Sequence, residues 1–316
     1  MKFRRLRLLD AGSFDHPSYL AISGLERALA ARGVKRWSNT GRLAKIWSRA
    51  VIRFGWTRFF VRLTLCTYFV VVMNLPARRY YPQGWWSPTI VYCFDCWEPD
   101  WDKWERFLRR NRIEVAFFTA RQSAEELARR LPGRRIAWMP EAIDPAPYRP
   151  GKPLASRSID LLEYGRHWVQ YHEVIAPHCL ARGYVHRFPT GGQLLFPTQQ
   201  ALYGGLGDAK LVVCVPQSLT TPDYAGRVST MTLRYLEAIG SGALIVGRCP
   251  PEMEDLFGFN PVIEIDENDP LGQLDSLLAS LPDLEPLRAR NLARLYEIGT
   301  WDARARRIIE FLTAHD

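Results

Sequence analysis

Short apolar runs alternate with longer amphipathic stretches through the first half of the chain. Runs suited to buried strands lie at residues 6–10, 68–73, 89–94, 115–119 and 135–139. Stretches with helical spacing of apolar positions lie at residues 18–32, 102–112 and 123–131. Strands that are apolar throughout have no solvated side, which is typical of a parallel sheet covered by helices on both faces. The first half is therefore predicted to be an α/β domain.

The same alternation restarts after residues 140–153, whose prolines are typical of a linker. Strands are predicted at residues 158–162, 184–188, 210–215, 243–246 and 261–265. Helices are predicted at residues 168–182, 198–206, 230–240, 271–281, 284–298 and 301–313. A chain of 316 residues is long enough for two domains of ordinary size. The expected division is an N-terminal domain at 1–150, a C-terminal domain at 151–300 and a closing helix at 301–316.

The most informative segment is residues 226–247, GRVSTMTLRYLEAIGSGALIVG. It predicts a polar loop with Ser229 and Thr230 near the helix start, then a helix, a glycine turn and a buried strand. A helix start beside a strand end, with a carboxylate one turn in, suits a nucleotide, because free amides face phosphate and the acid accepts from ribose hydroxyls. The spacing fits equally a core helix on which Arg234 and Glu237 form a solvated ion pair.

This segment resembles the donor-site helix of bacterial glycosyltransferases of the two-domain B fold. The similarity is greatest to the "glycosyl transferases group 1" set and its spore-maturation-protein-like branch. The shared pattern is Arg-x-x-Glu-Ala, here residues 234–238, then a small-residue turn and an apolar strand. The resemblance implies two Rossmann-like domains with parallel sheets facing a cleft. It also implies a nucleotide-sugar donor as co-substrate, no separate cofactor, and Glu237 on the donor ribose with Arg234 supporting it or the phosphate.

Other residues of the second half extend the resemblance. Gly165 and Arg166 match a strand-end pair whose arginine meets the donor diphosphate, a task suited to the planar fork of a guanidinium. Family members often add a lysine soon afterwards, and this chain has none there. Arg227 is the candidate for the missing charge, unless its loop is only a polar connector. Many members also carry a second glutamate where this chain has Ser229, so inversion of configuration stays open beside the retention that the resemblance favours.

Two polar residues of the first half follow predicted strands and are candidates for the acceptor site. His16 lies in the loop after the first strand and is a candidate general base toward an acceptor hydroxyl. Asp95 directly follows the third strand, close to Trp97 and Trp101, and a carboxylate there is expected to be partly desolvated. The alternatives are a surface histidine and an aspartate that caps the next turn.

Charge is distributed unevenly along the chain. Residues 1–150 carry 27 Lys and Arg against 13 Asp and Glu, whereas residues 151–316 carry 15 against 20. Basic groups at helical spacing alternate with aromatic residues within residues 36–65, which is typical of a surface that meets anionic lipid. A helix packed on the sheet with a solvated basic edge explains the pattern equally well, and an anionic acceptor is a third explanation. Arg58 and Arg62 interrupt the apolar stretch and argue against a membrane-spanning helix.

Cysteines and histidines do not form a recognisable metal pattern in the sequence. The six cysteines lie mostly in apolar runs, so we expect reduced, buried thiols in a cytoplasmic protein that is peripheral at most to the inner membrane face. No signal-peptide core is expected in the first ten residues. His167, His172 and His178 lack the spacing of helical metal ligands, so no metal site is expected.

The function predicted from these features is transfer of a sugar from a nucleotide-sugar donor to a sugar, lipid-linked or small-molecule acceptor, in bacterial glycan or glycoconjugate synthesis. One alternative is a B-fold sugar-nucleotide epimerase. Another is a non-catalytic basic protein that binds a membrane or a nucleic acid. The chain has no recognisable nucleic-acid-binding module, which disfavours nucleic acid as a partner.

Overall fold

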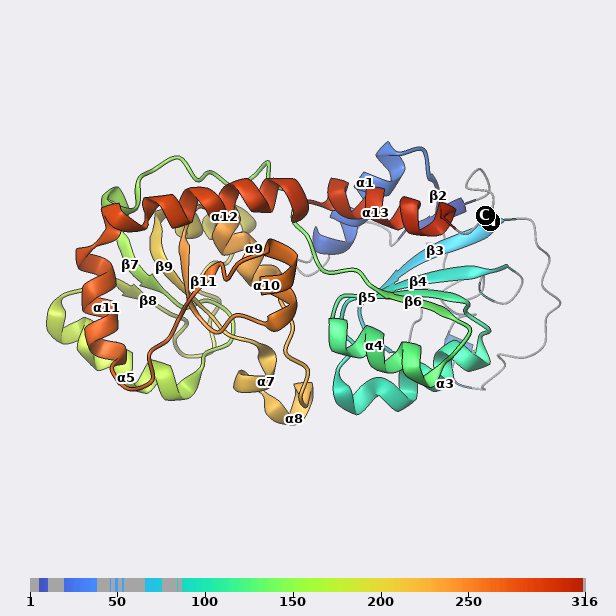
Figure 1. Ribbon diagram of the computed structural model, residues 1–316, viewed down its shortest axis with the longest axis horizontal. Coiled ribbons are helices and arrows are strands. Elements are labelled where there is room, and N and C mark those ends of the chain that lie inside the picture. The colour runs from blue at the N-terminus through green and yellow to red at the C-terminus, as the bar shows by residue number, and fades with distance from the viewer. Residues whose placement is uncertain are drawn as a thin grey trace. The chain divides into compact units, whose positions relative to one another are not determined.

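Two parallel β-sheets, each covered by helices, contain the apolar runs of the sequence (Figure 1). The computed structural model describes residues 6–10, 20–38, 46, 49–50, 53, 66–75, 84 and 87–314. These residues divide into two compact units. The first comprises residues 1–141, 224–228 and 301–316, and the second comprises residues 142–223 and 229–300.

The first unit contains a six-stranded sheet in the order β2-β1-β3-β4-β5-β6. Its strands are β1 (Leu6–Asp10), β2 (Lys35–Ser38), β3 (Thr67–Val72), β4 (Thr89–Cys93), β5 (Val115–Phe118) and β6 (Arg135–Trp138). Its helices are α1 (Leu20–Ala31), α3 (Trp101–Arg110), α4 (Arg121–Arg130) and α13 (Trp301–Thr313). Both β3 and β4 are buried along their whole length, as expected for inner parallel strands.

The last helix, α13, belongs to the first unit although it ends the chain. Trp301 at its start lies edge-on against Tyr92 and Phe94. Arg304 is almost fully buried and donates from Nε to the backbone oxygen of Pro140 at 2.9 Å. These contacts fix the helix through both its apolar face and a buried hydrogen bond, which explains why the chain returns to its first unit.

The second unit contains a five-stranded sheet in the order β11-β10-β9-β7-β8. Its strands are β7 (Ile159–Leu162), β8 (His186–Arg187), β9 (Ala209–Cys214), β10 (Leu244–Gly247) and β11 (Val262–Glu264). Its main helices are α5 (Val169–Arg182), α6 (Gln199–Asp208), α9 (Leu233–Gly240), α10 (Pro251–Phe257), α11 (Pro270–Ala279) and α12 (Glu285–Ile298). Two short helices, α7 (Gln217–Thr220) and α8 (Pro222–Ala225), lie in the loop after β9.

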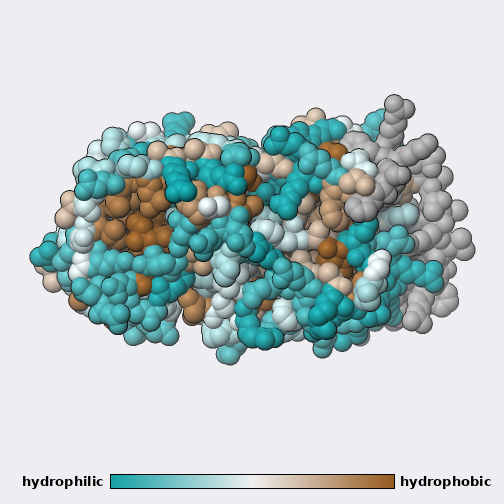
Figure 2. All heavy atoms as spheres, in the orientation of Figure 1, coloured by the Kyte–Doolittle hydropathy of each residue, from teal (hydrophilic) through white to brown (hydrophobic). Residues whose placement is uncertain are grey.

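Alternation along the strands of the second sheet builds a separate core on each face. Leu161 packs with α5 and α11, whereas its neighbour Leu162 packs with α9 and α10. Leu244 and Ile245 of β10 divide between the same two cores. Most of the view in Figure 2 is hydrophilic or mixed, and the largest brown area lies where Figure 1 places β7, β9 and β11.

Most of the expected strands and helices are present, with differences at their ends. The sequence did not predict β2 or α10, and the strand expected at 184–188 is reduced to His186 and Arg187. Most of the basic region at 36–65 lies outside the described residues. Within it, Arg49 and Arg53 are helical and exposed. In the part of the chain that the structure describes, no helix combines the length and apolar character needed to span a bilayer.

The glycine turn that ends α9 is a position where only glycine fits. Gly242 has a φ of +68°, and an added Cβ would lie 2.8 Å from the Cβ of Pro150 and 2.9 Å from Nη2 of Arg157. We expect Gly242→Ala to lower the unfolding free energy of the second unit by about 2–4 kcal/mol, since it combines left-handed strain with overpacking. Chemical denaturation followed by circular dichroism measures this.

Gly258→Ala is the matched control for this substitution. Its φ is +76°, and an added Cβ would meet nothing within 4 Å. It should therefore show only the backbone strain, about 1–2 kcal/mol. Equal losses in the two variants would mean that the close packing around Gly242 contributes nothing.

Candidate functional site

The order of strands in the second sheet points to one place for a ligand. From β7 the chain moves outward to β8 and then returns to β9 on the other side of β7. Loops that leave neighbouring strands in opposite directions leave a crevice at the carboxyl ends, where open α/β sheets bind ligands. The two loops that flank this point begin at Glu163 and Val215, directly after β7 and β9.

On one face of the sheet, this point is occupied by a buried acid held by two tyrosines. Glu237 of α9 is only 6% exposed. Its Oε1 accepts a hydrogen bond from the Tyr148 hydroxyl at 3.1 Å, and its Oε2 accepts one from the Tyr164 hydroxyl at 3.0 Å. Tyr148 comes from the proline-rich segment and Tyr164 from the end of β7. The structure therefore places Glu237 inside the second unit, not in a solvated ion pair on its surface.

Burial raises the pKa of Glu237 above its ordinary value and outweighs the lowering by the two tyrosine hydroxyls and by the charge of Arg234. The hydrogen bonds of Tyr164 agree with a neutral acid. Its single hydroxyl hydrogen faces both Oε2 of Glu237 and the backbone oxygen of Arg234. When Glu237 carries the proton, it donates to Tyr164, and Tyr164 donates to the backbone of Arg234.

A guanidinium one turn earlier on α9 is held by the loop after β7. Nη1 of Arg234 donates to the backbone oxygens of Tyr164 at 3.2 Å and Arg166 at 3.3 Å. Its Nη2 is buried and has no hydrogen-bond partner. Gly165, with a φ of +78°, brings the loop so close that an added Cβ would lie 3.3 Å from Nη1. A fixed positive charge with an unused buried donor suits an anionic ligand.

The structure brings Arg166, Arg234 and Glu237 to the same strand end. The backbone of Arg166 contacts Arg234, and its side chain lies in an exposed stretch of the loop. Three candidates separated by about 70 residues in the sequence are therefore gathered around one turn. No observation assigns them a ligand, so their roles toward a donor remain predictions.

The segment before α9 is arranged differently from the expected open amide cradle. Thr230 donates its hydroxyl hydrogen to Oε1 of Glu252 at 2.6 Å, and the amide of Met231 donates to the same oxygen at 2.9 Å. Glu252 is buried in the first turn of α10. A phosphate beside this carboxylate would be repelled, so an anion is better placed at Arg234 than at Thr230. Ser229, next to Thr230, is half-buried.

Arg227 lies in the first unit, because residues 224–228 pack there. Its backbone amide donates to Oε2 of Glu98 at 2.6 Å, and its Nη2 lies 2.6 Å from Oε1 of the same residue. The guanidinium and the backbone amide of Arg227 hold the pKa of Glu98 below its ordinary value. In this conformation Arg227 is therefore engaged by an acid of the first unit.

The acceptor candidates have different outcomes. Asp95 lies two residues beyond β4 at the carboxyl end of the first sheet and is half-buried, with its amide bonded to the oxygen of Met73 at 2.7 Å. His16 falls outside the described residues. Trp97 and Trp101 lie within the first core, so their rings are covered and do not offer open faces to a sugar.

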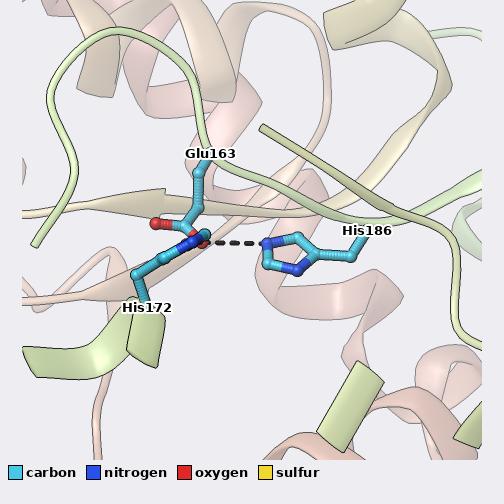
Figure 3. Close-up of side chains that lie close together, drawn as sticks. All are labelled: Glu163, His172 and His186. Atoms are coloured by element: carbon cyan, nitrogen blue, oxygen red, sulfur yellow. Dashed lines mark hydrogen bonds and ion pairs between the residues drawn. The ribbon is translucent and has the colours of Figure 1, made fainter. Parts of the chain in front are cut away.

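Sequence reasoning missed a group of acid and histidine side chains on the other face of β7. Figure 3 shows two imidazoles directed at the carboxylate of Glu163 from different elements. One donor atom each from Glu163, His172 and His186 lies within 4.8 Å of the others. The expectation of no metal site did not consider this group, because the pairing of β7 with β8 brings in His186, which the sequence spacing does not reveal.

Comparison with known proteins gives a match of fold. No family model matches the chain, and no curated protein matches its sequence. The structure of Anabaena Alr3699/HepE in complex with UDP and glucose matches with a TM-score of 0.58 and 9% identity, over 98% of this chain and 99% of that chain. The fold is the glycosyltransferase B fold.

Two further structures support the same fold. Sucrose-phosphate synthase (tll1590) from Thermosynechococcus elongatus matches with a TM-score of 0.59 and 12% identity, over 98% of this chain and 99% of that chain. Trehalose 6-phosphate synthase from Burkholderia multivorans has a TM-score of 0.56 and 12% identity, over 94% of this chain and 80% of that chain. The sequence-based prediction of fold class is therefore confirmed. At such identities the likeness establishes architecture and leaves activity to the residues.

The raised pKa of Glu237 gives a test of its environment. The folded state holds the proton more tightly than the unfolded state, whose ordinary value is 4.5. The contribution of Glu237 to the free energy of unfolding is therefore fully present below pH 4.5 and is lost as the pH rises through the folded-state pKa. Glutamine mimics the neutral acid and does not titrate. We therefore expect the melting temperature of Glu237→Gln to rise relative to the native protein as pH increases across this window.

Glu254→Gln supplies the control, because it makes the same substitution at an exposed position on α10. Its melting temperature should follow that of the native protein at every pH. If Glu237→Gln were less stable than the native protein by the same amount at every pH, the buried neutral acid would be refuted.

Proposed function

We propose that this chain is a nucleotide-sugar-dependent glycosyltransferase of the group 1 and spore-maturation-protein-like type whose second unit binds the donor. Arg234 carries the argument, because it is held by two backbone oxygens while its buried Nη2 has no partner. It lies at the strand-order reversal where this fold class binds ligands, one turn from Glu237. The B fold itself adds support, since the Anabaena structure that shares it contains UDP and glucose.

The roles follow from the chemistry of each group. Arg234 and Arg166 bind the donor diphosphate, since guanidinium groups donate to several phosphate oxygens at once. Glu237 lies one turn after Arg234 on α9. Its carboxyl oxygens have lone pairs that accept hydrogen bonds from ribose hydroxyls in addition to those from the tyrosines. The leaving diphosphate is stabilised by fixed positive charge, which requires no metal in the reaction.

The first unit receives the acceptor in this proposal. Asp95, at the carboxyl end of β4, and His16, in the loop that follows β1 in the sequence, are the candidate polar groups for an acceptor hydroxyl. The hydroxyl attacks the anomeric carbon, the bond from that carbon to the diphosphate breaks, and the hydroxyl proton is lost. Transfer with retention of configuration is proposed, with the departing diphosphate as the proton acceptor. The anomeric configuration of the product, read by NMR, decides this point.

Donor binding is the first test. Titration calorimetry with UDP-, GDP-, ADP- and dTDP-sugars should identify one donor class, and we expect a UDP-sugar. Arg234→Ala should weaken that binding by about 10- to 100-fold, the value of a hydrogen bond to a charged group, and Glu237→Gln should weaken it by about 2- to 10-fold, the value of a hydrogen bond between neutral groups. Arg234→Lys keeps the charge without the planar fork and serves if the alanine variant does not fold.

Arg182→Ala is the matched control for the loss of positive charge, because Arg182 is exposed on α5 and pairs with Asp275. It should bind the donor like the native protein. Native affinity in both Glu237→Gln and Arg234→Lys would refute the assignment of the donor site. Incubation of the protein with the donor alone distinguishes a transferase from an epimerase. An epimerase yields an altered sugar nucleotide without any acceptor.

The acceptor role is tested separately. Asp95→Asn should lower sugar transfer by about 10- to 100-fold, the value of a hydrogen bond from the acceptor hydroxyl to a charged group, while donor affinity stays unchanged. Asp100→Asn is its control, because Asp100 lies five residues later and pairs with Lys103. Unchanged transfer by Asp95→Asn would remove this residue from the reaction.

A further inference from the structure

The cluster around Glu163 comes together through the pairing of two strands and the position of one helix. Glu163 follows β7 and shares a face with Leu161, which lies opposite His186 of β8 in the parallel register. Helix α5 covers that face, and His172 lies in its first turn. All three side chains therefore reach the same point from separate elements (Figure 3).

The donor atoms are already close to the arrangement that a metal ion requires. Oε1 of Glu163 lies 2.7 Å from Nδ1 of His172 and 2.9 Å from Nε2 of His186. All three lie within 4.8 Å of one another. Two ligands at about 2.0–2.2 Å from a tetrahedral zinc ion are about 3.3–3.6 Å apart. Side-chain shifts of roughly 0.5–1 Å, which move the carboxylate oxygen away from the two imidazoles, would admit the ion.

Burial and charge make this cluster unusual for a purely structural network. The side chain of Glu163 is 2% exposed and that of His186 is 5% exposed. In the described part of the chain, every ion-pair partner of Glu163 is a histidine, and no lysine or arginine balances it. Nδ1 of His186 is buried without a hydrogen-bond partner. Burial works against ionisation, yet hydrogen bonds from His186, His172 and His167 together lower the pKa of Glu163.

We propose that Glu163, His172 and His186 bind a divalent transition-metal ion of the zinc class. Two imidazoles and one carboxylate form a donor set that suits zinc, cobalt and nickel and not magnesium or calcium, which prefer oxygen. Coordination uses the lone pairs of Nδ1 of His172 and Nε2 of His186, so each neutral ring then carries its proton on the other nitrogen. A fourth position remains for water or for His167, whose Nδ1 lies 3.1 Å from Oε2 of Glu163.

The site has a structural consequence for the neighbouring loop. Glu163 precedes the loop that carries Arg166, and His167 and His172 follow it. A metal ion that bridges Glu163 and His172 therefore fixes both ends of this loop. The inference does not rest on the proposed transferase activity, because it concerns the affinity and stability of the protein without any sugar nucleotide.

The experiment is metal binding by the full chain after treatment with a chelator. Competition with a chromophoric chelator should show one Zn²⁺ bound per chain. Glu163→Gln and His172→Ala should each weaken that binding by at least about 10- to 100-fold, the loss expected for disturbing a zinc site. His178→Ala is the matched control, since His178 lies on the same helix and pairs with Asp275 at 2.9 Å outside the cluster. It should bind Zn²⁺ like the native protein.

Cobalt substitution identifies the ligands. Co²⁺ bound to imidazole and carboxylate gives visible d–d absorption without the strong thiolate charge-transfer band that cysteine ligands produce. Circular dichroism in the presence of chelator establishes that each variant is folded, and His172→Gln replaces His172→Ala if the latter is not. The proposal is overturned by absence of stoichiometric Zn²⁺ binding, by equal affinity in the native protein and the folded cluster variants, or by a thiolate band.

Discussion

Two adjacent residues at the end of β7 organise both candidate sites, because successive residues on a strand point to opposite faces of the sheet. Glu163 faces α5 and meets His172 and His186. Tyr164 faces α9 and bonds to Glu237. Gly165 then turns with positive φ, so that the backbone passes over Arg234 without a Cβ in the way. A change in register by one residue would exchange the two faces and abolish both sites.

The two buried glutamates beside this strand end show how environment decides ionisation. Glu163 is buried, yet three imidazoles donate to it and its pKa falls. Only two phenol hydroxyls and one nearby arginine favour the ionised form of Glu237. The cost of burying its charge outweighs them, so its pKa rises. Glu163 is therefore suited to remain an anion and to bind a cation. Glu237 is suited to stay neutral until a ligand reorganises its hydrogen bonds.

The B fold limits the function without fixing it. Proteins with 9% and 12% sequence identity share this architecture with the chain, so conservation of the backbone does not require conservation of the site. In this chain, an arginine of the second unit has a buried donor atom without a partner, and a histidine cluster lies beside the loop after β7, where a lysine was sought. The specific chemistry rests on these side chains.

The sequence by itself determined most of the strands and helices and the α/β class, and it supplied Arg166, Arg234 and Glu237 as candidates. These features depend on local apolar periodicity, on glycine turns and on a short motif, all of which are visible within a few residues. Tertiary structure alone decided that Glu237 is enclosed by Tyr148 and Tyr164, that Arg227 pairs with Glu98, and that Glu163 gathers histidines. Each of these pairings joins separate elements of the chain. Strand order, strand register and the packing of helices over a sheet bring these residues together. Local sequence patterns do not predict such contacts, because the partners lie far apart along the chain.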